Sequence, residues 1–439
     1  MADGILDDLL LDIFALLPDP VDLLHCAGTC RRWLRLLGND RAILRRAALL
    51  PENEDARHAS FVLGAFYQNF FPVKAPVALE KTSRFPPRFG RIHATWRRLS
   101  LGSTSIIPNA DGLFNHAKPL ASRGGLLLVR LLPAPLDFGK LHLAVCHPLV
   151  GHVHVLPPPA VDLDHDRLGG DVTGYALLTG ADHHGHGHGP ATAFRVLFTA
   201  KNPSDDQLVP AYAYSSASCS WSAPIECPDV GGLTMSGPPD GVVDGRGTVH
   251  WLYTDHAWYY TLDVSADAAR VSLTKLPIPV SSGWEGPPFL CTAGRGKALS
   301  FVNSIDYGRM LELWTKREQD DDDDDHGEES SEGWLRCMLT TPQGQGPEAS
   351  EYFGILGFAE SRGAILVHGD VGFLCLDLES TALEEIRGRE SSNSGVDWYP
   401  GELSIRFWCT YNHLVFYDMD WSSYILHLLY GSLECTTMR

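Results

Sequence analysis

Apolar residues near the N-terminus recur at the spacing of a helix. Between residues 6 and 17 they lie three or four positions apart, and Asp7, Asp8 and Asp12 confine the charge to a narrow stripe. Pro18 ends the pattern, because proline lacks an N–H and restricts the residue before it. The pattern predicts a helix over residues 6–17 whose apolar face is wider than a single packing contact needs.

Further short helices are predicted after this one. They cover residues 21–27, a segment from about residue 29, and residues 40–50, where Pro51 ends the run. The first three helices form a unit of about forty residues, which cannot close a core alone. The segment therefore needs a partner, which is either the rest of the chain or another protein.

From residue 61 the helical spacing gives way to short apolar runs between Gly, Pro, Asp and Ser turns, and residues 61–67 are the first strand candidate. A loose unit of two strands and a stop then recurs. Its end points are residues 157, 228, 277, 342, 387 and 430. The base period of about 43–50 residues is that of a four-stranded propeller blade.

Two intervals between repeats are longer, and both contain low-complexity inserts. We expect flexible loops at residues 181–190 and 319–333, since loops tolerate extra length at small entropic cost. The predicted fold class is α+β and multidomain, with a small three-helix N-terminal domain and an all-β propeller of about six or seven blades. The predicted boundaries are residues 1–50, a connector over 51–60, and the propeller over 61–439.

Composition narrows the functional classes. The 439 residues are 44% hydrophobic and 20% charged, which is typical of a globular protein, and the net charge of −19 argues against general nucleic-acid binding. The ten cysteines include no Cys-x-x-Cys pair, so a zinc framework is not expected. The N-terminal segment carries acidic residues where a signal peptide has basic ones. The sequence has no apolar run long enough to predict a membrane span. We expect a cytoplasmic or nuclear protein.

The N-terminal segment contains five short motifs in order: Asp7-Asp8-Leu9-Leu10, Asp12-Ile13-Phe14, Leu17-Pro18, Leu23-Leu24 and Cys30-Arg31-Arg32-Trp33. Their order and spacing resemble the F-box, although Leu6 stands where that family has an early proline. The resemblance implies a contact with a Skp-type adaptor, and through it a cullin scaffold. The implied adaptor-binding residues are Ile5, Leu6, Leu9, Leu10, Ile13, Phe14, Leu17, Pro18, Leu23, Leu24, Cys30 and Trp33.

Three later motifs carry a second resemblance. They are SRGGLLL at residues 122–128, VCHPLVG at 145–151 and LPPP at 156–159. In these motifs the chain resembles the associated domain of plant F-box proteins, especially those of grasses. The resemblance covers most of residues 60–439 in outline.

No motif for catalysis or cofactor binding stands out, and no cofactor or metal is expected. The histidines at 183, 184, 186 and 188 are separated by glycines, and the acidic run at 320–325 lacks the ligand spacing of a calcium loop. The sequence at 294–297 fails as a phosphate loop. Aromatic residues gather at 251–260 and 398–421, where they suit either a recognition surface or the cores between blades.

These observations predict a substrate-recognition subunit of a Skp–cullin–F-box ubiquitin ligase that is not itself an enzyme. The helices would bind the adaptor and the β-domain would bind an unknown target protein, with no nucleic acid and no membrane involved. The alternative is a propeller enzyme or sugar-binding protein with a helical N-terminal cap, since a fold alone does not decide function.

Overall fold

The fold was analysed in a computed structural model. It describes residues 6–17, 23, 26, 29–39, 60–67, 88–91, 114, 117–131, 141–148, 152–159, 172–182, 193–201, 208–225, 232–265, 270–281, 286–294, 298–305, 310–317, 333–339, 354–360, 363–369, 372–381, 383–385 and 415–420. The helical prediction for residues 40–50 and both predicted loops lie outside these residues, apart from the loop ends at Ala181, Asp182 and Gly333.

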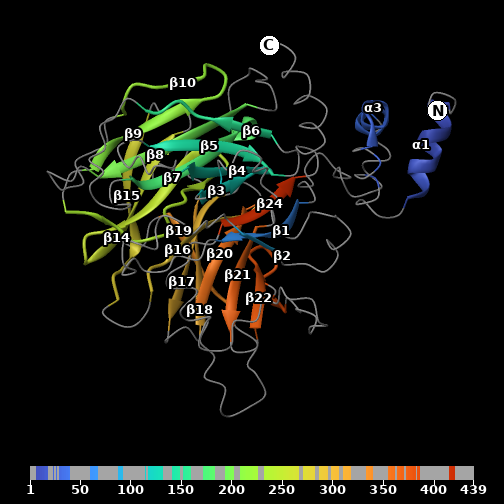
Figure 1. Cartoon of the computed structure of the whole chain (residues 1–439). Coiled ribbons are helices and arrows are strands. Elements are labelled where there is room, and N and C mark those ends of the chain that lie inside the picture. The colour runs from blue at the N-terminus through green and yellow to red at the C-terminus, as the bar shows by residue number, and fades with distance from the viewer. Residues whose placement is uncertain are drawn as a thin grey trace, which may run out of the picture.

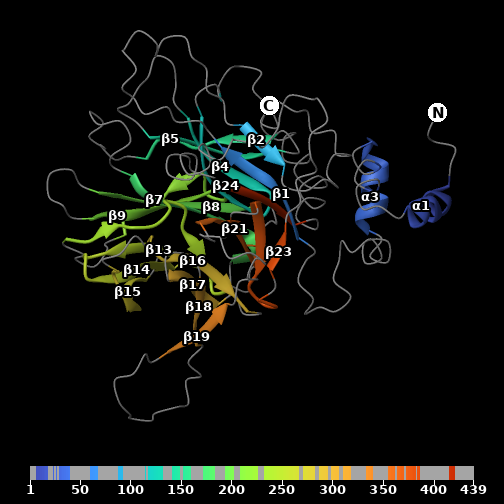
Figure 2. The ribbon, with the colours of Figure 1, turned by 90° about the horizontal axis from the view of Figure 1, so that it is seen from below.

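Two helices are described in the N-terminal segment, α1 (Asp7–Leu16) and α3 (Arg31–Asn39). The N–H of Leu10 donates to the carbonyl of Leu6 at 3.2 Å, and the N–H of Leu17 closes the last turn on the carbonyl of Phe14 at 3.1 Å. The helix predicted over residues 6–17 is thus confirmed to within one residue at each end. Both views show the two helices beside each other and apart from the sheets (Figures 1 and 2).

The strands form antiparallel sheets that follow the chain in order. The first sheet contains β3 (Lys118–Arg123), β4 (Leu126–Leu131), β5 (His142–His147) and β6 (His152–Val155). The second contains β7 (Val172–Thr179), β8 (Phe194–Lys201), β9 (Leu208–Ser215) and β10 (Ser220–Trp221). The third contains β11 (Thr234–Met235), β12 (Val242–Val243), β13 (Thr248–Thr254), β14 (Trp258–Ser265) and β15 (Val271–Pro279).

Two further complete sheets and one smaller sheet follow. The fourth contains β16 (Phe289–Ala293), β17 (Ala298–Ile305), β18 (Met310–Lys316) and β19 (Trp334–Leu339). The fifth contains β20 (Gly354–Ala359), β21 (Ala364–Gly369), β22 (Gly372–Asp377) and β23 (Leu383–Glu385). The closing sheet joins β2 (Arg88–Arg91), β1 (Ser60–Tyr67) and β24 (Val415–Asp420), in that order.

The sheets are arranged as a ring. Strand β3 packs on β7, β7 on β12 and β12 on β16, while β24 of the closing sheet packs on both β3 and β20. Figure 1 shows the result, with blue β1 from the N-terminal part beside red β24 from the C-terminal part. This is a five-blade propeller arrangement, closed by a sheet that draws on both ends of the chain.

The predicted count of six or seven blades is too high, because only five sheets are complete among the described residues. The last predicted repeat, ending at residue 430, corresponds to β24. Among the described residues that strand pairs with β1, from Ser60↔Asp420 to Phe66↔Val415, and not with a neighbour from the same part of the chain. The other repeat ends agree better: 157, 342 and 387 follow β6, β19 and β23 by two or three residues, and 277 lies in β15.

Each core lies between two neighbouring sheets. In β7, Tyr175 and Leu177 belong to the core shared with the first sheet, whereas Ala176 and Leu178 belong to the core shared with the third. Successive side chains of a strand point to opposite faces, so this alternation buries both faces of the sheet. The same relation joins the third sheet to the fourth and the fourth to the fifth.

Trp251 of β13 holds the second and third sheets together. Its side chain is 1% exposed, and its indole N–H donates to the carbonyl of Tyr175 at 3.2 Å. A Cβ atom added to Gly174 or Gly241 would lie 2.6 Å or 2.8 Å from the indole nitrogen. The ring therefore fits between two glycines, and their lack of side chains sets the spacing of β7 and β12.

Candidate functional site

Helix α1 carries an apolar stripe that the chain leaves uncovered. Leu6, Leu9, Ile13 and Leu16 are 77%, 54%, 44% and 81% exposed, and their three- and four-residue spacing places them on one side of the helix. Four large aliphatic side chains together form an apolar patch of the kind that marks an interaction site.

The adjoining face of α1 is buried within the chain. Leu10 and Phe14 are 2% and 1% exposed, and the Phe14 ring meets the ring of Trp33 in α3 edge-on, with centroids 5.2 Å apart. An ion pair fastens the same two helices, since Nη2 of Arg32 lies 2.6 Å from Oδ1 of Asp7. The exposed stripe is therefore presented on a helix whose other side is anchored.

The predicted adaptor-binding residues divide into groups of different exposure. Leu6, Leu9, Ile13 and Cys30 are exposed, Leu17 and Trp33 are partly buried, Leu10, Phe14 and Leu23 are buried, and Ile5, Pro18 and Leu24 lie outside the described residues. Leu16 is exposed in the same stripe but was missing from the prediction. Its position, three residues after Ile13, was the signal that would have found it.

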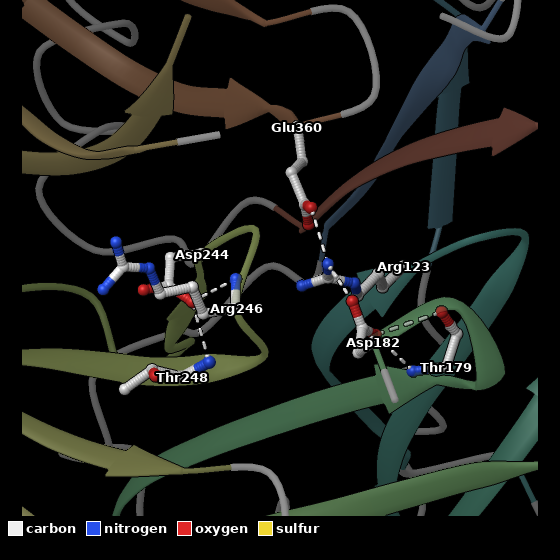
Figure 3. Close-up of polar contacts among 7 residues, drawn as sticks. All are labelled: Arg123, Thr179, Asp182, Asp244, Arg246, Thr248 and Glu360. Atoms are coloured by element: carbon white, nitrogen blue, oxygen red, sulfur yellow. Dashed lines mark hydrogen bonds and ion pairs between the residues drawn. The ribbon is translucent and has the colours of Figure 1, made fainter. Parts of the chain in front are cut away.

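A polar cluster lies inside the ring, where inner strands of three sheets end. Nη2 of Arg123, the last residue of β3, lies 2.6 Å from Oδ1 of Asp182 and 2.8 Å from Oε1 of Glu360. Asp182 ends the short helix η3 (Gly180–Asp182) after β7, and Glu360 follows β20. Figure 3 shows Arg123 between the two carboxylates. One guanidinium group thus links the first, second and fifth sheets.

Local structure fixes the members of this cluster. The turn after Arg123 is made by Gly124 and Gly125, whose φ angles of 55° and 78° suit glycine best. Asp182 accepts hydrogen bonds at Oδ2 from the backbone N–H of Thr179 at 2.7 Å and from the Thr179 hydroxyl at 3.1 Å. Arg123 and Asp182 are therefore both positioned by their local structure.

A second polar group lies in the third sheet. Asp244, after β12, accepts the backbone N–H groups of Arg246 and Thr248 at 2.9 Å and 2.8 Å. Buried His250 lies between two carboxylates, with Nε2 3.2 Å from Asp244 and Nδ1 2.7 Å from Asp263. The Thr274 hydroxyl donates to the other oxygen of Asp263 at 2.6 Å. This chain of contacts ties the β12–β13 turn to β14 and β15.

Burial and charge act in opposite directions on His250. Burial disfavours the imidazolium, but the hydrogen bonds and charges of Asp244 and Asp263 outweigh it and raise the pKa of His250 to about 8. For Asp244, burial favours the neutral acid, yet contacts with His250, Thr248 and Arg246 lower its pKa overall. The imidazolium between two carboxylates is therefore the dominant form at neutral pH.

Neither polar group was predicted as a site from the sequence. Arg123 lies in the SRGGLLL motif, but nothing local indicates that it meets Asp182 and Glu360. Among the predicted aromatic candidates, Trp251, Tyr253 and Tyr259 are buried core residues, while residues 398–411 and Trp421 lie outside the described residues. In the described part of the chain, no cluster of His, Cys, Asp or Glu is arranged to hold a metal ion, and no helix has the length and apolarity to cross a membrane.

The fold and the helical segment together define the class of protein. The chain combines an F-box-like domain, matched over residues 7–49, with a β-propeller arrangement. It belongs to the family described as Domain of unknown function (DUF7595), which matches residues 88–397 and thus most of the chain. No curated protein sequence matches the chain.

Solved propeller structures are similar at low identity. The structure of the Dos1 propeller has 10% identity and a TM-score of 0.33, covering 60% of this chain and 56% of that chain. The WD40 domain of SCAP from fission yeast has 11% identity and a TM-score of 0.32, covering 61% and 53%. The α-L-arabinofuranosidase Arb93A from Fusarium graminearum has 12% identity and a TM-score of 0.31, covering 58% and 70%. The chain thus spans just over half the length of the first two, and likenesses at this level carry no argument about activity.

Proposed function

We propose that this protein is the substrate-recognition subunit of a Skp–cullin–F-box ubiquitin ligase. The exposed stripe of α1 binds a Skp-type adaptor, and the propeller binds a target protein. The chain performs no covalent chemistry, and it raises the local concentration of the target near the ubiquitin-conjugating enzyme. This role places it in the cytoplasm or nucleus, and the resemblance to grass F-box proteins makes a plant origin part of the proposal.

The exposed stripe is the observation that carries this proposal. A short helical unit with one face buried and an adjoining apolar face open is what a helix-docking interface requires. Burial of each large aliphatic side chain contributes roughly 1.5–3 kcal/mol before ordering costs. Leu6, Leu9, Ile13 and Leu16 are therefore the proposed direct contacts, and buried Leu10, Phe14 and Leu23 support them from behind.

The proposed division of the chain follows from the same roles. Residues 1–50 form the adaptor-binding domain, residues 51–60 a connector, and residues 61–439 the target-binding propeller.

The test is adaptor affinity measured by calorimetry. Changing Leu9 and Ile13 together to Asp places two charges in the proposed contact while sparing the buried face. We expect a loss of several kcal/mol, on the order of a hundredfold or more in affinity. The variant should keep its helical circular dichroism, because both side chains are about half exposed.

The chain offers a matched control on the propeller. Leu335 and Met338 of β19 are 51% and 43% exposed, nearly the values of Leu9 and Ile13. Changing this pair to Asp adds the same charge at similar exposure and should leave adaptor affinity unchanged. Absence of wild-type binding, or equal binding by a folded Leu9→Asp, Ile13→Asp variant, would refute the proposed role.

A further inference from the structure

The acidic residues of α1 fall on two sides of the helix. Asp7 lies three and seven positions before Leu10 and Phe14, the two buried residues of α1, so these three residues form one row along the helix. This row faces α3, and there the carboxylate of Asp7 pairs with the guanidinium of Arg32. The charge of Asp7 is therefore balanced within the helical segment.

Asp12 lies at the edge of the exposed apolar stripe. It follows Leu9 by three residues and precedes Leu16 by four, so it adjoins two side chains of the stripe, on the edge away from α3. Asp8 lies one turn before Asp12 along the same side of the helix. Both aspartates are exposed, and neither makes a hydrogen bond or an ion pair with another described residue. Their charges are therefore open to a partner that covers the stripe.

The described charges around this edge are negative. α1 contains no basic residue. The basic side chains described in the helical segment, those of Arg32 and Arg35, belong to α3 on the opposite side of α1, and Arg32 is already paired with Asp7. In the described part of the segment, the stripe is thus apolar in its middle and acidic along one edge.

The position of Asp12 is unfavourable for the isolated helix. Aspartate is a weak helix former in a helix interior, and two like charges four residues apart repel each other. Asp8 is favoured by the positive end of the helix dipole, because it lies in the first turn. Asp12 lies more than one turn from that end, and no described residue compensates its charge. An unfavourable local choice beside an open apolar stripe is the pattern of a functional surface.

We propose that Asp8 and Asp12 select an adaptor whose apolar groove carries Lys or Arg side chains along one rim, and that such a side chain contacts Asp12 directly. This inference rests on the proposed function, since the occupant of the stripe is the Skp-type adaptor. Protein interfaces have an apolar centre and a polar rim, and rim charges act on the association rate and on the choice of partner. A positive charge beside Asp12 also offsets the repulsion between the two aspartates.

The experiment uses the full chain, with a purified plant Skp-type adaptor as the probe. Asp12→Asn removes the charge and Asp12→Lys reverses it. Lysine is a better helix former than aspartate and pairs favourably with Asp8, so Asp12→Lys should raise the thermal stability of α1 while it lowers adaptor affinity. A purely structural role of Asp12 would move both readouts in the same direction. Glu379→Gln is the matched control, because it removes one exposed carboxylate from the propeller.

At low ionic strength we expect adaptor affinity to fall about threefold for Asp12→Asn and about tenfold or more for Asp12→Lys, mainly through the association rate. Glu379→Gln should change it by less than about twofold. In about 1 M salt, where the Debye length is about 3 Å, Asp12→Asn should bind as wild type does to within about twofold. Equal or tighter binding by Asp12→Lys at low salt, or a loss in Asp12→Asn that persists at high salt, overturns the proposal.

A second measurement does not depend on the folding of a variant. In a crystal structure of the chain with the adaptor, a Lys or Arg nitrogen of the adaptor should lie within about 4 Å of a carboxylate oxygen of Asp12. A carboxylate that faces solvent or an acidic side chain of the adaptor would overturn the proposal. Failure of wild type to bind the adaptor would refute the ligase role and the acidic edge with it. Binding by wild type that does not depend on the charge at Asp12 would refute the role of the acidic edge alone.

Discussion

The helical segment and the ring treat their apolar side chains differently. Among the described residues, eight large apolar side chains are exposed. Half of them, Leu6, Leu9, Ile13 and Leu16, come from the ten residues of α1 and its N-cap. In the ring, every complete sheet shares a core with at least one neighbouring sheet. The sheets of the propeller therefore bury apolar side chains against one another, whereas the helical segment leaves an apolar stripe exposed.

The difference follows from geometry. A strand has two faces, and a ring of sheets covers both, so alternate side chains of β7 are buried in different cores. A helix on a small unit can bury only the stripe that faces its neighbours. In α1 that stripe contains Leu10 and Phe14, and the remaining apolar residues stay outside. The contrast predicts that damage to one region leaves the other intact.

The largest effect should come from Trp251→Ala in the ring. Removal of this buried ring leaves a cavity between Gly174 and Gly241, and we expect a loss of about 3–5 kcal/mol in the free energy of unfolding of the propeller. Urea unfolding followed by near-ultraviolet circular dichroism measures it. Adaptor affinity should not change, and a parallel loss of adaptor binding would break the proposed independence of the two regions.

A smaller effect is expected from truncations on neighbouring positions of α1. Leu10→Ala removes a buried side chain and should lower the free energy of unfolding of the helical segment by about 2–4 kcal/mol. Leu9→Ala removes an exposed side chain and should lower it by no more than about 0.5 kcal/mol. Far-ultraviolet circular dichroism during thermal unfolding compares the two. In adaptor binding Leu9→Ala should still weaken affinity, and equal stability of both variants would contradict the buried position of Leu10.

The pH dependence of stability should be confined to the ring. His250 is charged more readily in the folded chain, where its pKa is about 8, than when unfolded, where it is near 6.5. Its contribution is therefore fully present below pH 6.5 and is lost as the pH rises through about 8. The difference is worth about 2 kcal/mol at most. Urea unfolding at both ends of this range measures it.

Two variants test the assignment to His250. His250→Asn should flatten the pH dependence, because asparagine does not titrate. His152→Asn, a change at an exposed histidine of β6, should leave it as in wild type. An unchanged pH profile in His250→Asn would show that another group is responsible.

The smallest effect is expected at the exposed edge of the fourth sheet. Leu335→Ser in β19 should change the free energy of unfolding by no more than about 0.5 kcal/mol, because its side chain is 51% exposed. Thermal unfolding measures the change. A larger loss would mean that β19 is covered in solution. The contrast between exposed apolar side chains on α1 and buried ones in the propeller would then need revision.

Local patterns predicted the elements well and their long-range pairing poorly. The helix over residues 6–17 and the strand over residues 61–67 agree with α1 and β1 within a residue. The repeat ends agree with several sheets, because each complete blade is built from consecutive strands. The blade count was wrong since β24 pairs with β1 from the other end of the chain, and no local pattern records that partner.

The candidate sites divide in the same way. The apolar stripe of α1 could be read from helical spacing, but the separation of exposed Leu9 from buried Leu10 required the position of α3. For Arg123, only the neighbouring glycines were visible in the sequence. Its partners Asp182 and Glu360 lie beside other sheets, and their meeting with Arg123 depends on how the three sheets pack.

By itself, the sequence determined the helical N-terminus, the β-rich repeat and the lack of a recognisable catalytic motif, because spacing and turn residues act between near neighbours. Tertiary structure alone decided how the ring closes, which face of α1 stays open, and where Arg123, Asp182 and Glu360 meet. These features depend on residues far apart in the chain, and their contacts form only when the sheets pack around a common centre.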